Sequence, residues 1–276
     1  MRLAISNIAW DVPEDENIAE LLLHFGIDAI DVAPGKYFPK PSEATDSEIN
    51  RIKSRWAGYG IEITGMQSLL FGTNGLNVFG SQESQNEMTQ HLSAICRIGG
   101  SLGAKRLVFG SPRNRNRTGL TDQETTEIAM SFFSRLGDIA KENGVCICLE
   151  PNPICYGANF MTTSDETAKI VKLISHPAIK MQLDTGAMTI NNEDISSVLQ
   201  NYAHLIGHIH ASEPQLLPLG DGQTNHSQIA PIMQRYLPNH IVSIEMLATE
   251  NEPQMASIER ALHVAKQNYQ NNGAKP

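Results

Sequence analysis

The sequence predicts a single (β/α)8 barrel of the TIM-barrel class, an α/β fold that forms one domain over residues 1–276. Short β-rich runs alternate with longer amphipathic segments from end to end, which indicates a parallel sheet. Eight such units fit into the chain at about 34 residues each, without a linker or low-complexity stretch between them. A doubly wound sheet is the alternative, but it gives no reason for the count to stop at eight.

The strands are predicted from apolar, β-branched runs and the helices from apolar residues at helical spacing. In chain order, the predicted strands span residues 3–8, 27–33, 61–67, 105–111, 145–150, 179–185, 205–211 and 241–247. Eight helical segments are expected, the clearest of which span residues 16–25, 85–103, 125–144 and 257–269. Several segments end in a glycine that is typical of a helix C-cap. These glycines are Gly26, Gly60, Gly103 and Gly144.

Composition limits the partners of the protein. The formal net charge is −9, and the basic residues cluster only around residues 113–117. This argues against nucleic acid as a partner, because phosphate binding needs a broad positive surface. No run of about 18 apolar residues is present, so no membrane partner is expected. The N-terminus lacks the apolar core of a signal peptide, which predicts a cytoplasmic protein whose four cysteines form no structural disulfide.

In a (β/α)8 barrel the active site lies at the carboxyl ends of the strands. In order, the residues at these ends are Asn7, Asp31, Gln67, Gly110–Ser111, Glu150, Asp184, His210 and Glu245. The last four can all bind a metal, and their separations of 34, 26 and 35 residues match one βα unit. They are therefore expected at one level on consecutive strands. Three carboxylates and one imidazole suit one divalent ion such as Mn²⁺, Mg²⁺, Co²⁺ or Zn²⁺.

The seventh predicted strand carries two histidines, His208 and His210. They point to the same side of the strand because strand side chains alternate, and roughly 6.6 Å of rise separates them. His210 is expected level with the acids. His208 is expected one layer lower, inside the barrel, where it supports the site through hydrogen bonds instead of binding the metal.

The strand ends read CLEPN, QLDTG, HIHAS and SIEM. In this pattern, and along the whole chain, the sequence resembles the xylose isomerase-like barrel superfamily, in its sugar phosphate isomerase and epimerase branch. The resemblance implies one divalent metal ion held by Glu150, Asp184, His210 and Glu245. It also implies that Glu150 and Glu245 are the catalytic acid–base pair and that the partner is a small-molecule sugar or sugar phosphate.

The chemistry that the resemblance implies is proton abstraction α to a carbonyl, through a metal-bound enediolate, by one carboxylate and proton return by the other. Return to the same carbon gives epimerisation and return to the neighbouring carbon gives isomerisation, and both stay open. A keto-inositol (inosose-type) dehydratase is an alternative, because it begins with the same step. An endonuclease-like metal hydrolase is disfavoured because its additional histidines are absent, and a non-catalytic binding protein would have lost a ligand. Related barrels often associate, so a homo-oligomer also stays open.

Substrate-binding candidates lie at or beyond the strand ends. Amides there can bind hydroxyl groups, and the cations offer donors to a phosphate or carboxylate. The candidates are Asn7, Lys36, Gln67, Arg113, Arg115, Asn152 and His208. Ala187 and Leu216 stand where the free-ketose 3-epimerases that the sequence resembles carry a histidine and an arginine. The substrate is therefore expected to be held by other means.

Overall fold

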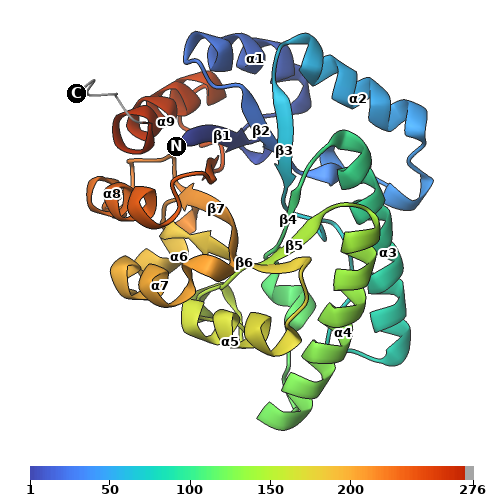
Figure 1. Ribbon diagram of the computed structural model, residues 1–276. Coiled ribbons are helices and arrows are strands. Elements are labelled where there is room, and N and C mark those ends of the chain that lie inside the picture. The colour runs from blue at the N-terminus through green and yellow to red at the C-terminus, as the bar shows by residue number, and fades with distance from the viewer. Residues whose placement is uncertain (271–276) are drawn as a thin grey trace.

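The computed structural model describes residues 1–270, in which eight parallel strands close into a barrel inside a ring of helices (Figure 1). Each strand pairs with its neighbours in sequence, and β8 pairs with β1 to close the barrel. The strands are β1 (Arg2–Ser6), β2 (Ala29–Val32), β3 (Glu62–Met66), β4 (Arg106–Phe109), β5 (Cys146–Leu149), β6 (Ile179–Asp184), β7 (Ile206–Ser212) and β8 (Ile241–Glu245). The predicted fold class is confirmed.

Residues 1–270 contain nine α-helices where eight helical segments were expected, because two short helices follow β6. The first of these ends at Ile190, Asn192 then adopts a left-handed φ of 52°, and Asp194 caps the next helix. The helices are α1 (Asp15–His24), α2 (Asp46–Gly58), α3 (Gln82–Leu102), α4 (Asp122–Glu142), α5 (Ser164–Ile174), α6 (Thr185–Ile190), α7 (Ile195–Tyr202), α8 (His226–Tyr236) and α9 (Gln254–Tyr269).

Local sequence explains where the helices begin and end. Thr45 before α2 and Thr121 before α4 each form a capping box with the glutamate three residues later. The four glycines predicted to end helices all adopt left-handed φ values of 67–95°, which glycine tolerates best. Among the helices of residues 1–270, none combines the length and the apolar character that a membrane span needs.

The strands place polar side chains at one mouth of the barrel. Seven of the eight strands end one or two residues before the predicted ends, so Asn7, Gln67 and Glu150 begin the loops that follow β1, β3 and β5. Below the mouth the interior is packed. Cys148 on β5 is fully buried, and burial raises the pKa of its thiol. Its sulfur does not belong to either of the groups of potential metal ligands that gather within residues 1–270.

Candidate active site

Four side chains from the last four strands converge at the carboxyl mouth of the barrel. We call these four residues the mouth cluster: Glu150, Asp184, His210 and Glu245. Each offers one potential ligand atom, and these four atoms lie within 4.8 Å of one another. His210 Nδ1 lies 3.2 Å from Glu245 Oε2, 3.3 Å from Glu150 Oε1 and 3.8 Å from Asp184 Oδ2. The structure thus brings the four predicted ligands together around one imidazole.

The four residues do not lie at one level of the sheet, as the spacing suggested. Asp184 pairs in register with His210, but Glu245 pairs with Ser212, two residues further along β7. The reason is that the strands of a closed barrel are staggered, so equal positions in successive units shift along the axis. The glutamate side chain is long enough to bring its carboxylate back toward the imidazole.

Neighbouring groups hold two of the carboxylates in place. Ser212 Oγ donates to Asp184 Oδ2 at 2.9 Å, and the Ala187 backbone N–H donates to Asp184 Oδ1 at 2.6 Å. Gln67 Nε2 donates to Glu245 Oε1 at 2.7 Å. Each carboxylate keeps an oxygen toward His210, which is the support expected around a metal ligand. Sequence reasoning did not find Ser212, a residue that becomes visible only once its strand is paired with β6.

Glu150 occupies space left by a glycine. A Cβ at Gly110 would overlap Glu150 Oε2, so the glycine just after β4 leaves room for this carboxylate in its observed position. Asn152 Nδ2 lies 3.3 Å from the same oxygen, within hydrogen-bond distance. Arg115 donates to the Glu150 backbone carbonyl at 2.7 Å. The backbone and one oxygen of Glu150 are therefore fixed from the loops after β4 and β5.

The crowding of carboxylates shifts the pKa values of the mouth cluster. Burial, together with the charges of Glu245 and Glu150, raises the pKa of Asp184 to about 8. Burial disfavours the charged form of His210, but Glu245 and Glu150 raise its pKa well above the ordinary value. Burial also opposes the charge of Glu245, yet His210 and Gln67 lower its pKa. One imidazole does not balance three acids, so a further positive charge would stabilise the cluster.

A divalent cation fits this donor set. Ligand atoms about 2.0–2.2 Å from one ion lie at most about 4.4 Å apart, close to the 4.8 Å within which the four atoms gather. Carboxylate oxygens and an imidazole nitrogen are ligands of Mn²⁺, Mg²⁺, Co²⁺ and Zn²⁺. Asp184 and His210 are buried, and the Glu150 and Glu245 side chains are only 12% exposed, which strengthens their attraction for a cation.

A second polar group lies one layer deeper, as expected for the first histidine of the pair. His208 Nε2 lies 2.8 Å from Asp31 Oδ2, and its Nδ1 lies 3.1 Å from the side-chain amide of Gln182. Thr64 Oγ1 donates to Asp31 Oδ1 at 3.1 Å. Asp31 and His208, hereafter the inner pair, are both buried. Although Asp31, His208 and His210 also gather within 4.8 Å, this group holds a single carboxylate and therefore lacks the crowding of acids that marks the mouth cluster.

Above the mouth cluster, the loops enclose a cleft with two lobes that share Gly110, Glu150 and Glu245. The narrow lobe has a volume of about 190 Å³ and is also lined by Gln67, Ser68, Leu69, Leu70, Phe71, Val108, Phe109 and Ser111. The wide lobe has a volume of about 390 Å³ and is also lined by Pro112, Pro151, Asn152, Pro153, Tyr156, Asp184, Ala187, Glu213, Gln215 and Leu216. Among residues 1–270, no lysine or arginine lines either lobe.

Two of the seven substrate-binding candidates, Gln67 and Asn152, line the cleft. Two of the three cations are directed elsewhere by backbone carbonyls, because Lys36 donates to those of Asn7 and Trp10 and Arg115 donates to that of Glu150. Burial lowers the pKa of Arg115 to about 10. The candidates that line neither lobe are Asn7, Lys36, Arg113, Arg115 and His208. No cation among them is placed to meet a substrate anion in this cleft.

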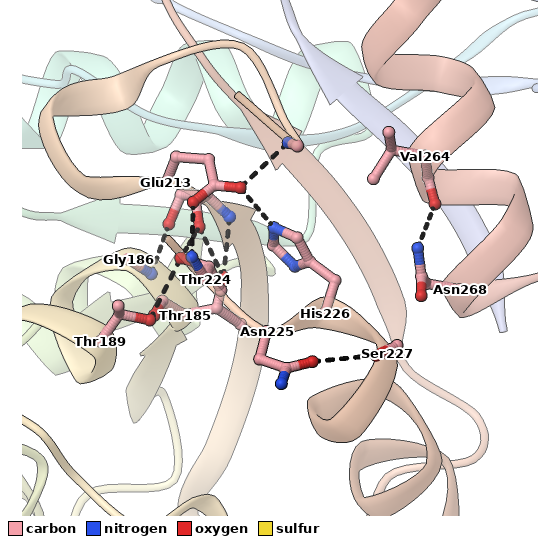
Figure 2. A network of polar contacts seen from close by, with 12 residues as sticks. Thr185, Gly186, Thr189, Glu213, Thr224, Asn225, His226, Ser227, Val264 and Asn268 are labelled. Carbon is pink, nitrogen blue, oxygen red and sulfur yellow. Dashed lines mark hydrogen bonds and ion pairs between the residues drawn. The ribbon is translucent and has the colours of Figure 1, made fainter. Parts of the chain in front are cut away.

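A buried network holds the loop that follows β7 (Figure 2). Glu213 accepts hydrogen bonds from the backbone N–H groups of Gly220 and Thr224, both at 2.9 Å, and its Oε1 lies 3.0 Å from His226 Nε2. His226 Nδ1 lies 2.5 Å from the hydroxyl of Tyr269 on α9. Burial opposes the charge of Glu213, but His226 and these donors lower its pKa. Nothing in the sequence marks Glu213 as the buried partner of this loop, because its donors come from residues 7 to 13 positions further along the chain.

The chain belongs to the xylose isomerase-like TIM barrel family, whose model matches residues 19–267. A search of curated proteins finds no match. Among solved structures, the chain is similar to D-psicose 3-epimerase from Clostridium cellulolyticum H10, with 19% identity and a TM-score of 0.81 over 98% of this chain and 100% of that one.

Two further structures with the same fold extend the comparison. The 3-keto-D-glucoside 4-epimerase from E. coli is 14% identical, with a TM-score of 0.79 over 97% of this chain and 99% of that one. The IOLI protein, determined with a bound zinc atom, is 17% identical, with a TM-score of 0.74 over 98% of this chain and 100% of that one. At these identities the similarity establishes the fold.

Proposed function

We propose that the protein is a divalent-metal-dependent isomerase or epimerase that acts on a small uncharged sugar or sugar-like polyol. The observation that carries this proposal is that Glu150 and Glu245 line both lobes of the cleft and also face the imidazole of the mouth cluster. A substrate bound in the cleft therefore contacts two carboxylates that stand beside a metal site. The sugar epimerases among the similar structures support the same reaction class.

The two glutamates supply the acid–base chemistry. One carboxylate removes the proton from the carbon next to the substrate carbonyl, and the other returns a proton from a second direction. His210 lowers the pKa of Glu245, which keeps that carboxylate ionised and competent as a base, and Gln67 fixes its orientation. A bound divalent ion supplies Lewis-acid stabilisation of the negative charge that develops on the substrate oxygens. We propose that this ion is Mn²⁺, Mg²⁺, Co²⁺ or Zn²⁺.

The lining of the cleft supports an uncharged substrate. Phosphates and carboxylates in ligands are usually met by arginine, lysine or helix N-termini. Neither lobe is lined by a lysine or arginine within residues 1–270, and the carboxylates of the mouth cluster repel an anion. The amides of Gln67 and Asn152 and the hydroxyl of Ser111 instead suit the hydroxyl groups of a sugar.

Metal analysis and solvent exchange test this proposal. The purified protein is expected to bind about one equivalent of a divalent ion. With the ion it is expected to introduce deuterium from D₂O into a keto-sugar at the carbon α to the carbonyl. Glu150→Gln is expected to reduce this exchange at least about a thousandfold, whereas Glu259→Gln, on the exposed face of α9, is the matched control. Loss of water from the substrate would instead identify a dehydratase, and the absence of metal-dependent exchange on any keto-sugar would refute the proposal.

A further inference from the structure

The two lobes of the cleft differ in size and chemistry. The wide lobe, at about 390 Å³, falls in the range of pockets that bind drug-sized ligands, whereas the narrow lobe, at about 190 Å³, lies below it. Gln67, Ser68 and Ser111 give the narrow lobe hydrogen-bonding groups beside the two shared glutamates. The narrow lobe therefore suits one polar sugar ring whose reacting carbons face the mouth cluster.

The lining of the wide lobe is mainly apolar. Asp184 and Asn152 lie beside the proposed metal site and Glu213 is held by the loop network, whereas the other walls include three prolines, Tyr156 and Leu216, with Gln215 as a further polar residue. Ile154 and Leu217, which adjoin these walls in the sequence, are exposed large apolar side chains. A single sugar ring does not account for an apolar extension of this kind, because hydroxyl groups lose their water there without gaining partners.

The wall formed by Gln215 and Leu216 is held in a defined conformation. Both residues adopt a left-handed backbone, with φ values of 61° and 55°, which is costly for residues other than glycine. The Gln215 N–H donates to the Tyr156 hydroxyl at 2.7 Å, and the Leu216 carbonyl accepts from the Leu247 N–H at 2.9 Å. Strain that is held by specific bonds at the edge of a cleft is typical of a binding wall built for its ligand.

We propose that the natural substrate is a glycoside whose sugar ring carries the ketone in the narrow lobe and whose apolar aglycone occupies the wide lobe. This inference rests on the proposed isomerase or epimerase function. Because a glycosidic bond blocks the anomeric carbon, the carbonyl must stand at another ring carbon. A carboxylate takes the proton from the carbon next to that carbonyl, and the C–H electron pair moves toward the carbonyl oxygen. Protonation from the opposite side then restores the ketone with the carbon inverted, and the glycosidic bond stays intact.

Binding tests the aglycone site without requiring turnover. We expect phenyl glucoside to bind the metal-loaded protein at least about tenfold more tightly than methyl glucoside, as measured by competition in saturation-transfer NMR. The aromatic protons are expected to receive the strongest saturation. Tyr156→Ala and Leu216→Ala, made separately, are each expected to reduce this preference at least about threefold. Leu173→Ala removes an exposed leucine of the same size from the outer helix α5 and is expected to leave the preference unchanged.

Turnover then separates the two proposals. Deuterium exchange is compared for methyl and phenyl 3-ketoglucosides and for a free ketohexose. An at least tenfold higher kcat/KM for the phenyl compound supports the aglycone site. The aglycone site is refuted if exchange is equally fast on all three compounds, or if the methyl and phenyl glucosides bind equally tightly. Neither result contradicts the proposed function. Failure of metal-dependent exchange on every compound refutes the proposed function itself, whatever the binding preference.

Discussion

Two histidines on one strand, His208 and His210, meet different numbers of carboxylates. In the inner pair, His208 Nε2 meets one carboxylate at 2.8 Å, and both members are buried. In the mouth cluster, His210 Nδ1 meets two carboxylates at 3.2 and 3.3 Å and a third at 3.8 Å. Both groups combine imidazole and carboxylate side chains that are at most 12% exposed, so neither feature separates them. They differ in the number of acids around each imidazole, and the metal site that we propose rests on this difference.

The strongest test of this difference removes the central imidazole. His210→Asn is expected to weaken binding of the divalent ion at least about a thousandfold, because even residues that merely support a metal ligand contribute 10–100-fold. Metal content after dialysis and a calorimetric titration measure the effect. His204→Asn, at an exposed histidine just before β7, is the control. Retention of one tightly bound ion in His210→Asn would show that the mouth cluster is not the metal site.

The inner pair is expected to respond in the opposite way. His208→Asn should retain about one equivalent of metal but lower the free energy of unfolding by about 3 kcal/mol, because it leaves the Asp31 carboxylate buried without the imidazole that it meets. Denaturant unfolding and metal analysis on the same preparation separate the two effects. Equal metal loss in His208→Asn and His210→Asn would contradict the division between the two groups.

The sequence alone predicted much of this contrast. The alternation of strands and helices defined the barrel, and the carboxyl ends of the last four strands supplied the mouth cluster before any geometry was known. The two-residue offset of His208 from His210 was enough to predict that they occupy different layers. These features follow from the period of a strand and the repeat of one βα unit, and both are local properties of the chain.

The remaining features depend on contacts that no local pattern records. Asp31, the partner of His208, comes from β2, far from β7 in sequence. In the sequence, Arg113 and Arg115 after β4 look like an anion site, but Arg115 folds inward onto the Glu150 carbonyl. Backbone carbonyls compete with a ligand for the N–H donors of a lysine or arginine. The conformation of the loop therefore decides which polar group such a side chain reaches. Loop geometry and the staggering of strands were therefore the limits of prediction.

Metal removal sharpens the comparison further. At a free ion concentration of about 100 times the Kd, binding stabilises the folded state by about 2.7 kcal/mol. Chelation is therefore expected to lower the melting temperature of the wild-type protein by about 5–10 °C. The melting temperature of His210→Asn should not respond to the chelator, whereas that of His208→Asn should fall as in the wild type. An unresponsive wild-type protein would argue that no ion occupies the mouth cluster.

The smallest effect is expected at Glu213, another buried acid near β7. Like Asp31, it lies within hydrogen-bond distance of one histidine. Its pKa lies below the ordinary value because His226 and two backbone N–H groups stabilise the carboxylate against the cost of burial. A carboxyl whose pKa falls on folding adds stability at pH values above its unfolded pKa, and this stability is lost as the pH falls through the folded pKa.

In chelated protein, Glu213→Gln should therefore lower the melting temperature by a few degrees at pH 7 and by less at pH 4, where the wild-type protein loses part of the same stabilisation. Glu259→Gln, exposed on α9, should show no such convergence with the wild type. If Glu213→Gln melts at the wild-type temperature throughout this pH range, the Glu213–His226 pair does not stabilise the loop as its geometry indicates.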